Sequence, residues 1–277
     1  MSEIPYIQVK NITQTFGTQE VLKGVSFDVH RGELLALIGG SGAGKSVILK
    51  HLIGLLNPLS GSVMIDGNPM SNVSDSKQAI LRAKMGFMFQ QGALFDSMTV
   101  AENIAFPLIE AGITNESEIT RRVQEALDSV DLGTHGDKMP ANLSGGMIKR
   151  VAVARAIVSN PECLFYDEPT AGLDPIVTDS VSYLIRKICV GNAITSIIVT
   201  HDMGSVIHIA DRIIFLNQGR VYWEGTPEEL LQTQDPFLYD FVVGHSGEDW
   251  KKIQSSNRPD FQKEMLQDAL AERYHQS

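Results

Sequence analysis

The chain reads Gly39-Gly40-Ser41-Gly42-Ala43-Gly44-Lys45-Ser46 at the point where a predicted strand meets a predicted helix. The compact apolar run from Glu33 to Ile38 is typical of a buried strand, and the residues from Lys45 to Leu56 follow a helical pattern. The stretch between them fits G-x-x-x-x-G-K-[ST], which forms a phosphate-binding loop in this strand–loop–helix context. The sequence therefore predicts an α/β fold with a P-loop that binds a nucleotide.

Each residue type in this loop has a chemical reason to be there. Glycines allow positive φ angles, so that backbone N–H groups can surround phosphate oxygens at the start of a helix. Lys45 would bring a positive charge to the β- and γ-phosphates, and the Ser46 hydroxyl can bind Mg²⁺. We expect the run from Gly39 to Val47 to contact ATP. The alternative is a glycine-rich turn with an incidental lysine.

A second apolar run, Cys163-Leu164-Phe165-Tyr166, ends in the carboxylates Asp167 and Glu168. Asp167 can hold the metal through its water shell, and Glu168 can polarise the attacking water. Acidic strand ends are common, so this pattern gains its meaning from the phosphate loop. Together the two predict a Mg²⁺-dependent nucleotide hydrolase.

Leu143-Ser144-Gly145-Gly146-Met147 precedes a helix and predicts a second anion site. Ser144 is a plausible N-cap, and Gly145 and Gly146 leave backbone N–H groups uncovered. This site has no lysine of its own. Two molecules that face each other could share two nucleotides. Each nucleotide would lie between the Lys45 loop of one molecule and the Ser144 loop of the other. The alternative is an ordinary capped helix.

The pattern along the chain divides the protein into a core, an insertion and a tail. We expect strands within residues 5–30, with a turn at Asn11–Gln19, and later strands that include a hairpin around Asn217-Gln218-Gly219. The residues from Gln90 to about Asn160 are mostly helical in pattern. The predicted organisation is an α/β P-loop ATPase domain at 5–225, a helical subdomain inserted at about 91–160, and a C-terminal helical extension at 226–277.

The extension contains an amphipathic pattern at Asp260–Tyr274. We expect a helix there, with a possible cap at Asp260. Three outcomes stay open: the helix packs on its own subunit, it frays into solvent, or it docks on a neighbouring ATPase subunit.

Composition excludes several classes of protein. The 277 residues include 23 Lys and Arg against 33 Asp and Glu, a formal net charge of -10, which argues against nucleic acid as a partner and against docking on anionic lipid by bulk charge. No apolar stretch approaches the roughly 18 residues of a membrane span, and the N-terminus lacks the pattern of a signal peptide. The two cysteines, Cys163 and Cys189, lie in apolar runs and suggest neither a disulfide framework nor a metal site. We expect a soluble, cytosolic protein that meets the membrane through a protein partner.

Over roughly residues 5–230 the chain resembles the nucleotide-binding subunit of an ABC transporter. The resemblance is carried by Gly39–Ser46, Gln90, Leu143–Met147, Tyr166–Glu168, Gly172–Asp174 and His201. It implies that Gln90 lies near Mg²⁺ and the membrane partner, and that Asp174 contacts the opposing subunit. It also implies that His201 contacts the γ-phosphate and that Phe16 stacks on adenine. ATP would close a homodimer and hydrolysis would reopen it. Alone, His201 could be a capping residue and Phe16 a core aromatic.

Two stretches, Phe89–Phe95 and Met98–Leu108, are similar to the ATPases paired with MCE-protein lipid transporters. That resemblance implies phospholipid as cargo, moved between the inner and outer membranes to maintain outer-membrane lipid asymmetry. The implied partners are an integral membrane permease, an MCE-domain periplasmic protein and a STAS-domain protein. The subunit would lie at the cytoplasmic face of the inner membrane. Met147 departs from the family's usual Gln, which puts in doubt any contact made by that side chain.

Three other functions stay open. The first is the ATPase of another importer, for an amino acid or other small solute, although a methionine importer would usually carry a larger C-terminal sensing domain. The second is a soluble ABC ATPase acting on ribosomes or DNA, which would usually have two cassettes or a long coiled-coil insertion. The third is a nucleotide-binding scaffold without hydrolysis, and the presence of Glu168 speaks against it.

Overall fold

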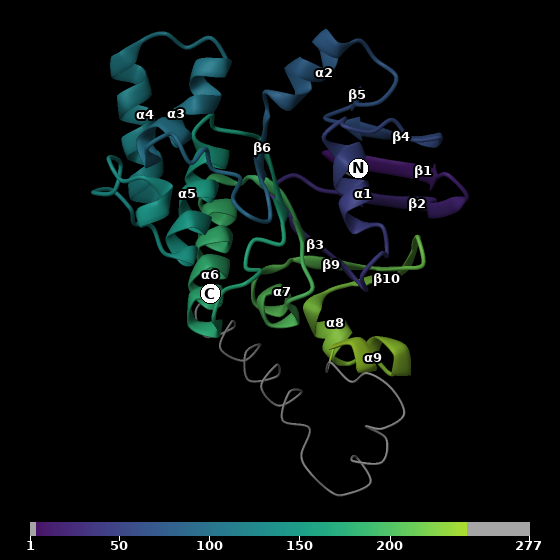
Figure 1. Ribbon diagram of the computed structural model, residues 1–277. Coiled ribbons are helices and arrows are strands. Elements are labelled where there is room, and N and C mark those ends of the chain that lie inside the picture. The colour runs from purple at the N-terminus through teal and green to yellow at the C-terminus, as the bar shows by residue number, and fades with distance from the viewer. Residues whose placement is uncertain (1–3, 243–277) are drawn as a thin grey trace, which may run out of the picture.

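The computed structural model describes residues 4–242, and the predicted helix at Asp260–Tyr274 lies outside them. Within that range the chain forms a main sheet, a smaller antiparallel sheet and a set of helices (Figure 1). The main sheet has six strands in the order β10 (Arg220–Gly225), β9 (Arg212–Asn217), β3 (Leu34–Gly39), β8 (Thr195–Val199), β7 (Cys163–Asp167) and β6 (Met85–Met88). Strands β9 to β6 are parallel, and β10 joins the edge as the antiparallel arm of the predicted hairpin.

The central strand β3 is apolar throughout because both of its faces are covered. Leu34, Ala36 and Ile38 belong to a core shared with most of the helices. Leu35 and Leu37 belong to a second core shared with the antiparallel sheet. Parallel sheets buried on both faces give continuous apolar runs of this kind, so the predicted buried strand is confirmed.

The antiparallel sheet has the order β2 (Gln19–Val29), β1 (Ile7–Phe16), β4 (Ser60–Ile65) and β5 (Asn68–Pro69). The expected turn at Asn11–Gln19 is wrong, because β1 continues to Phe16, which pairs with Gln19. A bulge explains the misleading pattern. The pairing shifts between Val9 and Ile12, and Asn11 takes a φ of 47° while its N–H donates to Ser26 Oγ at 2.8 Å.

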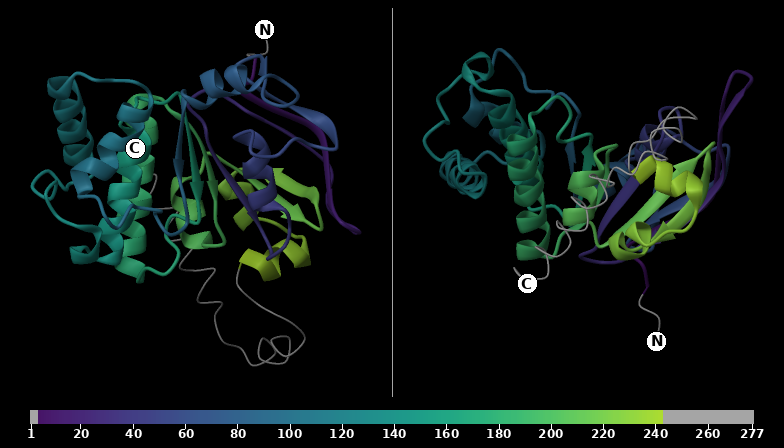
Figure 2. Two further views of the ribbon diagram at one scale, coloured as in Figure 1. Left: turned by 45° about the horizontal axis from the view of Figure 1, so that its top comes forward. Right: turned by 90° about the horizontal axis from the view of Figure 1, so that it is seen from below.

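The helices form two groups. Close to the sheets lie α1 (Lys45–Leu52), α2 (Asp75–Arg82), α6 (Pro175–Asn192) and α7 (Met203–Ile209). The predicted helical subdomain contains α3 (Val100–Glu110), α4 (Glu116–Ser129), the short 3-10 helix Pro140–Asn142 and α5 (Gly145–Ile157). This subdomain lies on one side of the main sheet and the antiparallel sheet on the other (Figure 2). The sequence had not indicated α2.

The start of the predicted extension packs on the core. Helices α8 (Pro227–Leu231) and α9 (Pro236–Val242) place Leu230, Leu231, Leu238 and Val242 in the core shared with the helical subdomain. Phe241 of α9 lies 4.7 Å, centroid to centroid, from Phe215 of β9. Residues 226–242 are thus held to the ATPase core by apolar contacts.

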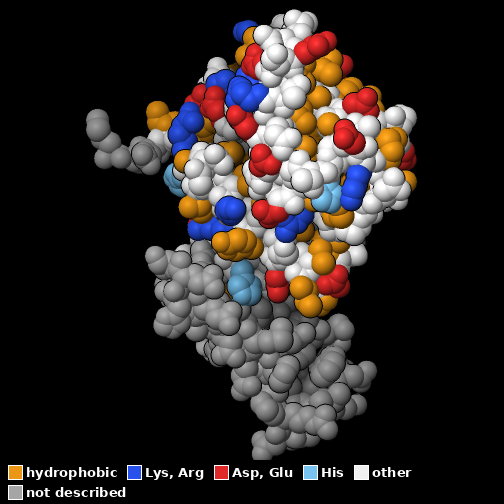
Figure 3. Space-filling view, turned by 90° about the vertical axis from the view of Figure 1, so that its left-hand side faces the viewer, with side chains coloured by type: hydrophobic (Ala, Val, Ile, Leu, Met, Phe, Trp, Pro, Cys, Tyr) orange, Lys and Arg blue, Asp and Glu red, His pale blue; other side chains and the backbone are white. Residues whose placement is uncertain are grey.

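The surface of the helical subdomain is mixed in charge. Acidic, basic and apolar side chains are interspersed on that side of the molecule (Figure 3), and α4 carries the ion pairs Arg121–Glu125 and Arg122–Glu118. Among residues 4–242, no helix combines the length and the apolar character that a bilayer span requires.

Candidate nucleotide-binding site

The P-loop joins the end of β3 to the start of α1. Gly39 has a φ of 147°, and a Cβ there would lie 2.3 Å from the Leu216 carbonyl oxygen. Gly44, the N-cap of α1, has a φ of 105°, and its Cβ would lie 2.6 Å from Leu22 Cδ2. At these positive φ angles a larger residue at position 39 would collide with the β9 backbone, and one at position 44 would have to displace the Leu22 side chain. The backbone itself therefore fixes the loop around the helix N-terminus.

Lys45 lies inside the loop that precedes it. Its Nζ donates to the carbonyl oxygens of Gly39, at 2.7 Å, and Gly40, at 3.1 Å. Burial lowers the pKa of Lys45, while the nearby Glu168 and Asp167 carboxylates act in the opposite direction. The ammonium is thus held at the mouth of the loop, where a phosphate could replace the two carbonyls as its partner.

Asp167 and Glu168 follow one another at the end of β7 but have different surroundings. Burial, and then the neighbouring Glu168 charge, raise the pKa of Asp167, while Lys45 and Lys50 act to lower it. Glu168 takes a φ of 48°, in the left-handed region. Such a conformation costs about 1–3 kcal/mol in a non-glycine residue and persists only where surrounding contacts hold it.

His201 is a hydrogen-bond partner of the Glu168 carboxylate. The distance from His201 Nδ1 to Glu168 Oε2 is 2.9 Å, and the Glu168 side chain is 14% exposed against 70% for His201. The histidine therefore covers the carboxylate from the solvent side. This places a hydrogen-bonding group beside the predicted general base.

One hollow of about 730 Å³ brings most of the predicted site together. It is lined by Gly39 to Val47, Gln90, Asp167, Glu168 and His201, with Gln19, Val21, Val199 and Phe241 in addition. Phe16 is absent from this lining and is 47% exposed at the end of β1. Since Phe16 pairs with Gln19, which does line the hollow, Phe16 lies beside its rim. Its stacking on adenine stays a prediction.

The predicted second anion site lies apart from this hollow. Ser144 caps α5 as expected, because its Oγ accepts from the Met147 N–H at 3.3 Å. Ser144 and Gly145 are exposed, whereas a Cβ on Gly146 would lie 2.5 Å from Val177 Cγ1 at the start of α6. Within one chain the capped helix N-terminus thus faces no nucleotide pocket, and its role in a second molecule's site stays a prediction.

The residues that would hold a cation are of the right kind for Mg²⁺. Ser46, Gln90 and Asp167 line the same hollow and offer hydroxyl, amide and carboxylate oxygens, the hard ligands that Mg²⁺ prefers alongside water and phosphate. The glycine loop above them has no room for a further side chain at Gly39 or Gly44. The lining thus fits a metal-bound nucleotide.

Sequence reasoning missed several residues of the site. Gln19, Val21 and Phe241 come from distant parts of the chain and carry no motif. Lys149 of α5 was also missed, although it lies under the site and its Nζ donates to the carbonyl oxygens of Gln90 and Glu168. A signal was present, because Lys149 shares a helix face with the apolar Ala152, Val153 and Ala156, where a cation is unusual.

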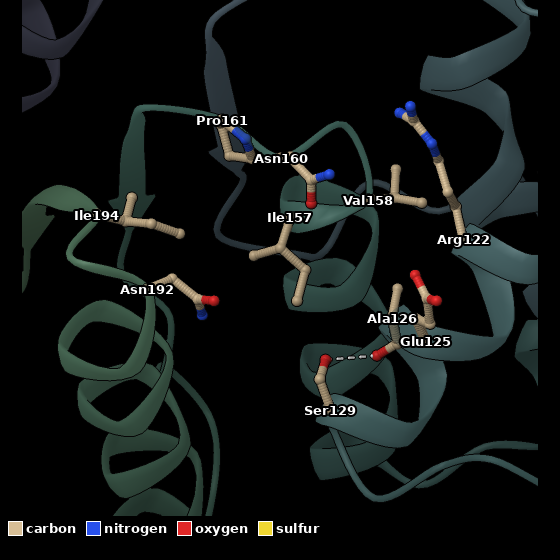
Figure 4. Close-up of a pocket in the computed structure, with 10 residues that line it drawn as sticks. All are labelled: Arg122, Glu125, Ala126, Ser129, Ile157, Val158, Asn160, Pro161, Asn192 and Ile194. Atoms are coloured by element: carbon tan, nitrogen blue, oxygen red, sulfur yellow. Dashed lines mark hydrogen bonds between the residues drawn. The ribbon is translucent and has the colours of Figure 1, made fainter.

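A second hollow, of about 420 Å³, lies near the amino ends of the parallel strands, between α4 and the ends of α5 and α6 (Figure 4). Pro161 and Ile194 in its lining precede the strands β7 and β8, whereas the P-loop follows the end of β3. Ligands of open α/β sheets bind outside the carboxyl ends of the strands. The hollow in Figure 4 is therefore not part of the nucleotide site.

Comparison with known proteins agrees with this geometry. The family model described as "ABC transporter" matches residues 22–171. The chain is 38% identical to the chloroplastic protein TRIGALACTOSYLDIACYLGLYCEROL 3 of Arabidopsis thaliana, covering 86% of this chain and 73% of that protein. It is 37% identical to the intermembrane phospholipid transport system ATP-binding protein MlaF of Haemophilus influenzae, covering 87% of this chain and 91% of MlaF.

Importer subunits are similar as well. The chain is 39% identical to the methionine import ATP-binding protein MetN of Carboxydothermus hydrogenoformans, covering 85% of this chain and 71% of MetN. Among solved structures, a dimeric ATP-binding cassette in a post-hydrolysis state, bound to ADP and Pi, superposes with a TM-score of 0.73 at 33% identity. That match covers 80% of this chain and 98% of the cassette.

Proposed function

The chain belongs to the ABC transporter family as an ATP-binding subunit, and from this premise we propose that it hydrolyses ATP to move phospholipids between two membranes. The observation that carries the lipid assignment is the similarity to MlaF over 91% of that protein's length. The similarity to TRIGALACTOSYLDIACYLGLYCEROL 3, whose name is that of a glycolipid, supports a lipid as cargo.

The residues of the hollow divide the work of hydrolysis. The backbone of the P-loop and Lys45 bind the β- and γ-phosphates, and Ser46, Gln90 and Asp167 hold Mg²⁺. When bound, Mg²⁺ would offset the charge that develops on the phosphates. Glu168 orients a water molecule toward the γ-phosphorus and accepts its proton as the new P–O bond forms and the bond to ADP breaks.

The contact between His201 and Glu168 would help to orient the general base for this step. The 2.9 Å contact holds the Glu168 carboxylate on the open side of the pocket. His201 would also reach the γ-phosphate, since it lines the same hollow as Lys45. One side chain would thus connect the general base with the phosphate that it helps to release.

Two copies of the chain would complete two sites. Ser144 and Gly145 are exposed at the start of α5, Gly146 is half-buried beside them, and none of the three lines the nucleotide hollow of its own chain. A second copy facing the first would bring this loop over the γ-phosphate held by Lys45. ATP would then bind at the interface and hold the dimer closed.

The membrane permease would dock beside Gln90. Phe89 and Phe95 are 45% and 41% exposed on the loop that leads from β6 to α3, and Phe95 contacts Phe106 at 4.8 Å between ring centroids. The buried Asn103 holds this loop, because its Oδ1 accepts from the Phe95 N–H at 2.8 Å and its Nδ2 donates to the carbonyl oxygens of Phe95 and Met98. A fixed, exposed apolar surface suits a protein interface.

The remaining assignments follow from the relatives. We propose an MCE-domain periplasmic protein and a STAS-domain protein as further partners, with the subunit at the cytoplasmic face of the inner membrane. The second candidate is an importer ATPase for an amino acid or another small solute, which the 39% identity to MetN favours.

The test is purification of the intact complex from membranes, followed by mass spectrometry of its proteins and bound lipids. ATP-dependent transfer of labelled phospholipid between vesicle populations is then measured, with Lys45→Ala as the control that lacks the phosphate ligand. Co-purified phospholipid and Lys45-dependent transfer are expected. A complex that instead stimulates uptake of methionine or another solute, without lipid transfer, would establish the importer function.

A further inference from the structure

Lys149 is a buried cation in the first turns of α5. The residue is only 5% exposed and lies on the helix face that carries Ala152, Val153 and Ala156. Lysine is almost never fully buried unless it is paired. Its Nζ donates to two backbone carbonyl oxygens, those of Gln90 and, at 3.4 Å, Glu168. A buried charge is thus committed to two peptide groups of the catalytic site.

One of those peptide groups controls the orientation of Glu168. The residue has a left-handed φ of 48°, its N–H donates to the Val199 carbonyl at 2.8 Å, and its carbonyl accepts from the Ala171 N–H at 3.2 Å. The Lys149 ammonium is the charged contact on that same carbonyl. Because φ and ψ of Glu168 set the direction of its side chain, the contact from Lys149 bears on where the carboxylate points.

The other peptide group belongs to the loop that follows β6. Lys149 holds the carbonyl of Gln90, and Arg155, further along the same helix, donates to the carbonyls of Gly92 at 2.6 Å and Ala93 at 2.8 Å. A Cβ on Gly92 would lie 3.0 Å from Ile148 Cγ2, so the loop also lies close against α5. The first part of the loop, from Gln90 to Ala93, is therefore fastened to α5 by two cationic side chains.

We propose that Lys149 is a positioning residue that couples the N-terminus of α5, which carries Ser144, to the peptide groups of Gln90 and Glu168. A displacement of α5 when Ser144 meets a nucleotide of the facing chain is transmitted through Lys149 to the metal ligand and the general base of its own chain. Lys149 touches no substrate, and its effect is on the geometry of the groups that do.

The electrostatics of the contact agree with this role. Burial lowers the pKa of Lys149, and the Glu168 charge acts to raise it. An ammonium in this setting gains more from carbonyl partners than it would in water, and removing it takes away the hydrogen bond that the Gln90 carbonyl accepts from Lys149. The proposal depends on the ATPase activity in the proposed function and is independent of the cargo.

The experiment compares Lys149→Met, Lys149→Arg and the wild-type chain, with Lys187→Met as matched control. Lys187 is an exposed lysine of α6, outside the hollow. For each protein, kcat and KM for ATP, the Kd for ATP and the melting temperature are measured. If Lys149→Met does not fold, Lys149→Gln, which keeps a neutral N–H donor, replaces it.

We expect Lys149→Met to lower kcat by at least about tenfold, since small displacements of catalytic groups have effects of that size. The Kd for ATP should stay within about twofold of wild type, because the P-loop and Lys45 are unchanged. Lys149→Arg should recover at least about a third of kcat, because a guanidinium can donate to the same two carbonyls.

The proposal is overturned if Lys149→Met keeps more than half of the wild-type kcat, if its ATP affinity falls in parallel with kcat, or if Lys149→Arg is as inactive as Lys149→Met. These rates are measured on the purified chain without permease or lipid. A wild-type complex that hydrolyses ATP but transfers no lipid would overturn the proposed cargo and leave the Lys149 result readable.

Discussion

Glu168 combines a strained backbone with a nearly covered carboxylate. Its left-handed φ of 48° turns the residue at the end of β7, and His201 Nδ1 lies 2.9 Å from Oε2. Non-glycine residues in such conformations are concentrated at functional sites, where the surrounding structure holds them. The geometry thus separates the role of Glu168 from that of the adjacent Asp167, whose pKa is raised by burial while Lys45 acts to lower it.

Replacing Glu168 by Gln should keep ATP binding and lower turnover by about 10²–10⁴-fold, the usual contribution of a general base. The amide has nearly the same shape but cannot accept the proton of the attacking water. ATP binding by fluorescence titration and phosphate release are the measurements, with the exposed Glu116→Gln on α4 as control. Near wild-type phosphate release from Glu168→Gln would assign the base elsewhere.

At the residue scale the sequence predicted those groups whose chemistry is local. Gly39–Ser46 could be recognised because the strand, the loop and the helix are contiguous. Asp167 and Glu168 could be recognised because they end an apolar run. Lys149 could not be assigned a role in this way, since its partners lie 59 and 19 positions away. Phe16 was placed at the nucleotide by resemblance, and the structure leaves it at the rim.

At the element scale, the N-terminus of α5 supports a test of the shared site. Ser144→Arg, made in the Glu168→Gln background so that bound ATP persists, should prevent ATP-dependent dimer formation. The long side chain would occupy the exposed cap where a facing phosphate must approach. ATP affinity of the monomer should change little, because the hollow around Lys45 does not include Ser144.

Size-exclusion chromatography with light scattering, with and without ATP, gives the dimer fraction. Thr120→Arg, on the exposed side of α4, adds the same charge away from the cap and is the matched control. Equal dimer fractions in the Ser144→Arg and Thr120→Arg proteins would refute the shared-site arrangement.

The loop between β6 and α3 offers a second test at this scale. Leu94 packs partly against the core, so a charge there would also disturb folding. Phe95 is 41% exposed and is the better probe of the surface. Phe95→Asp should release the subunit from membranes while its ATP affinity and melting temperature stay near wild type, because a charge at an apolar interface is left without a partner.

The measurement for Phe95→Asp is the fraction of subunit that sediments with membranes containing the other components. Tyr183→Asp changes another exposed aromatic, 65% accessible on α6, and should remain bound. Equal membrane retention of the two variants would place the permease contact away from the Phe95 loop.

The helices and strands that the sequence predicted well are those whose residues all have the same degree of burial. The apolar strands β3, β7 and β8 are buried on both faces, and their runs could be recognised directly. The helix α2 buries only Gln78 and Leu81 and leaves Ile80 66% exposed, so its eight residues carried little periodic signal. The turn misplaced at Asn11–Gln19 has a similar cause, because the bulge near Asn11 interrupts the alternation along β1.

On the scale of the whole molecule, the order of the elements along the chain does not predict which of them are neighbours in space. The strands β3, β8 and β7 lie side by side although up to about 160 residues separate the paired positions, such as Leu37 and Val199. The formation of a separate antiparallel sheet from β1, β2, β4 and β5 could not be obtained from local pattern. The same holds for α8 and α9, which the pattern along the chain places in an extension beyond the ATPase domain.

The last prediction concerns that boundary. A chain that ends at Gly225 loses α8 and α9, and with them the core contacts of Leu230, Leu231 and Leu238. Each such side chain contributes about 1.5–3 kcal/mol when buried, before the cost of ordering the two helices. It also loses Phe241, which lines the nucleotide hollow and contacts Phe215. We therefore expect a lower free energy of unfolding and weaker ATP binding.

A chain that ends at Val242 keeps all of these contacts and is the matched control. Urea unfolding of the two truncated chains is followed by tryptophan fluorescence and by circular dichroism. The chain ending at Gly225 should unfold at a lower urea concentration, and its free energy of unfolding should be lower by several kcal/mol. Its m-value should also be smaller, because less surface is buried in the folded state. Equal stability of the two truncated chains would show that the ATPase core is complete at Gly225 and that α8 and α9 lie on it without supporting it.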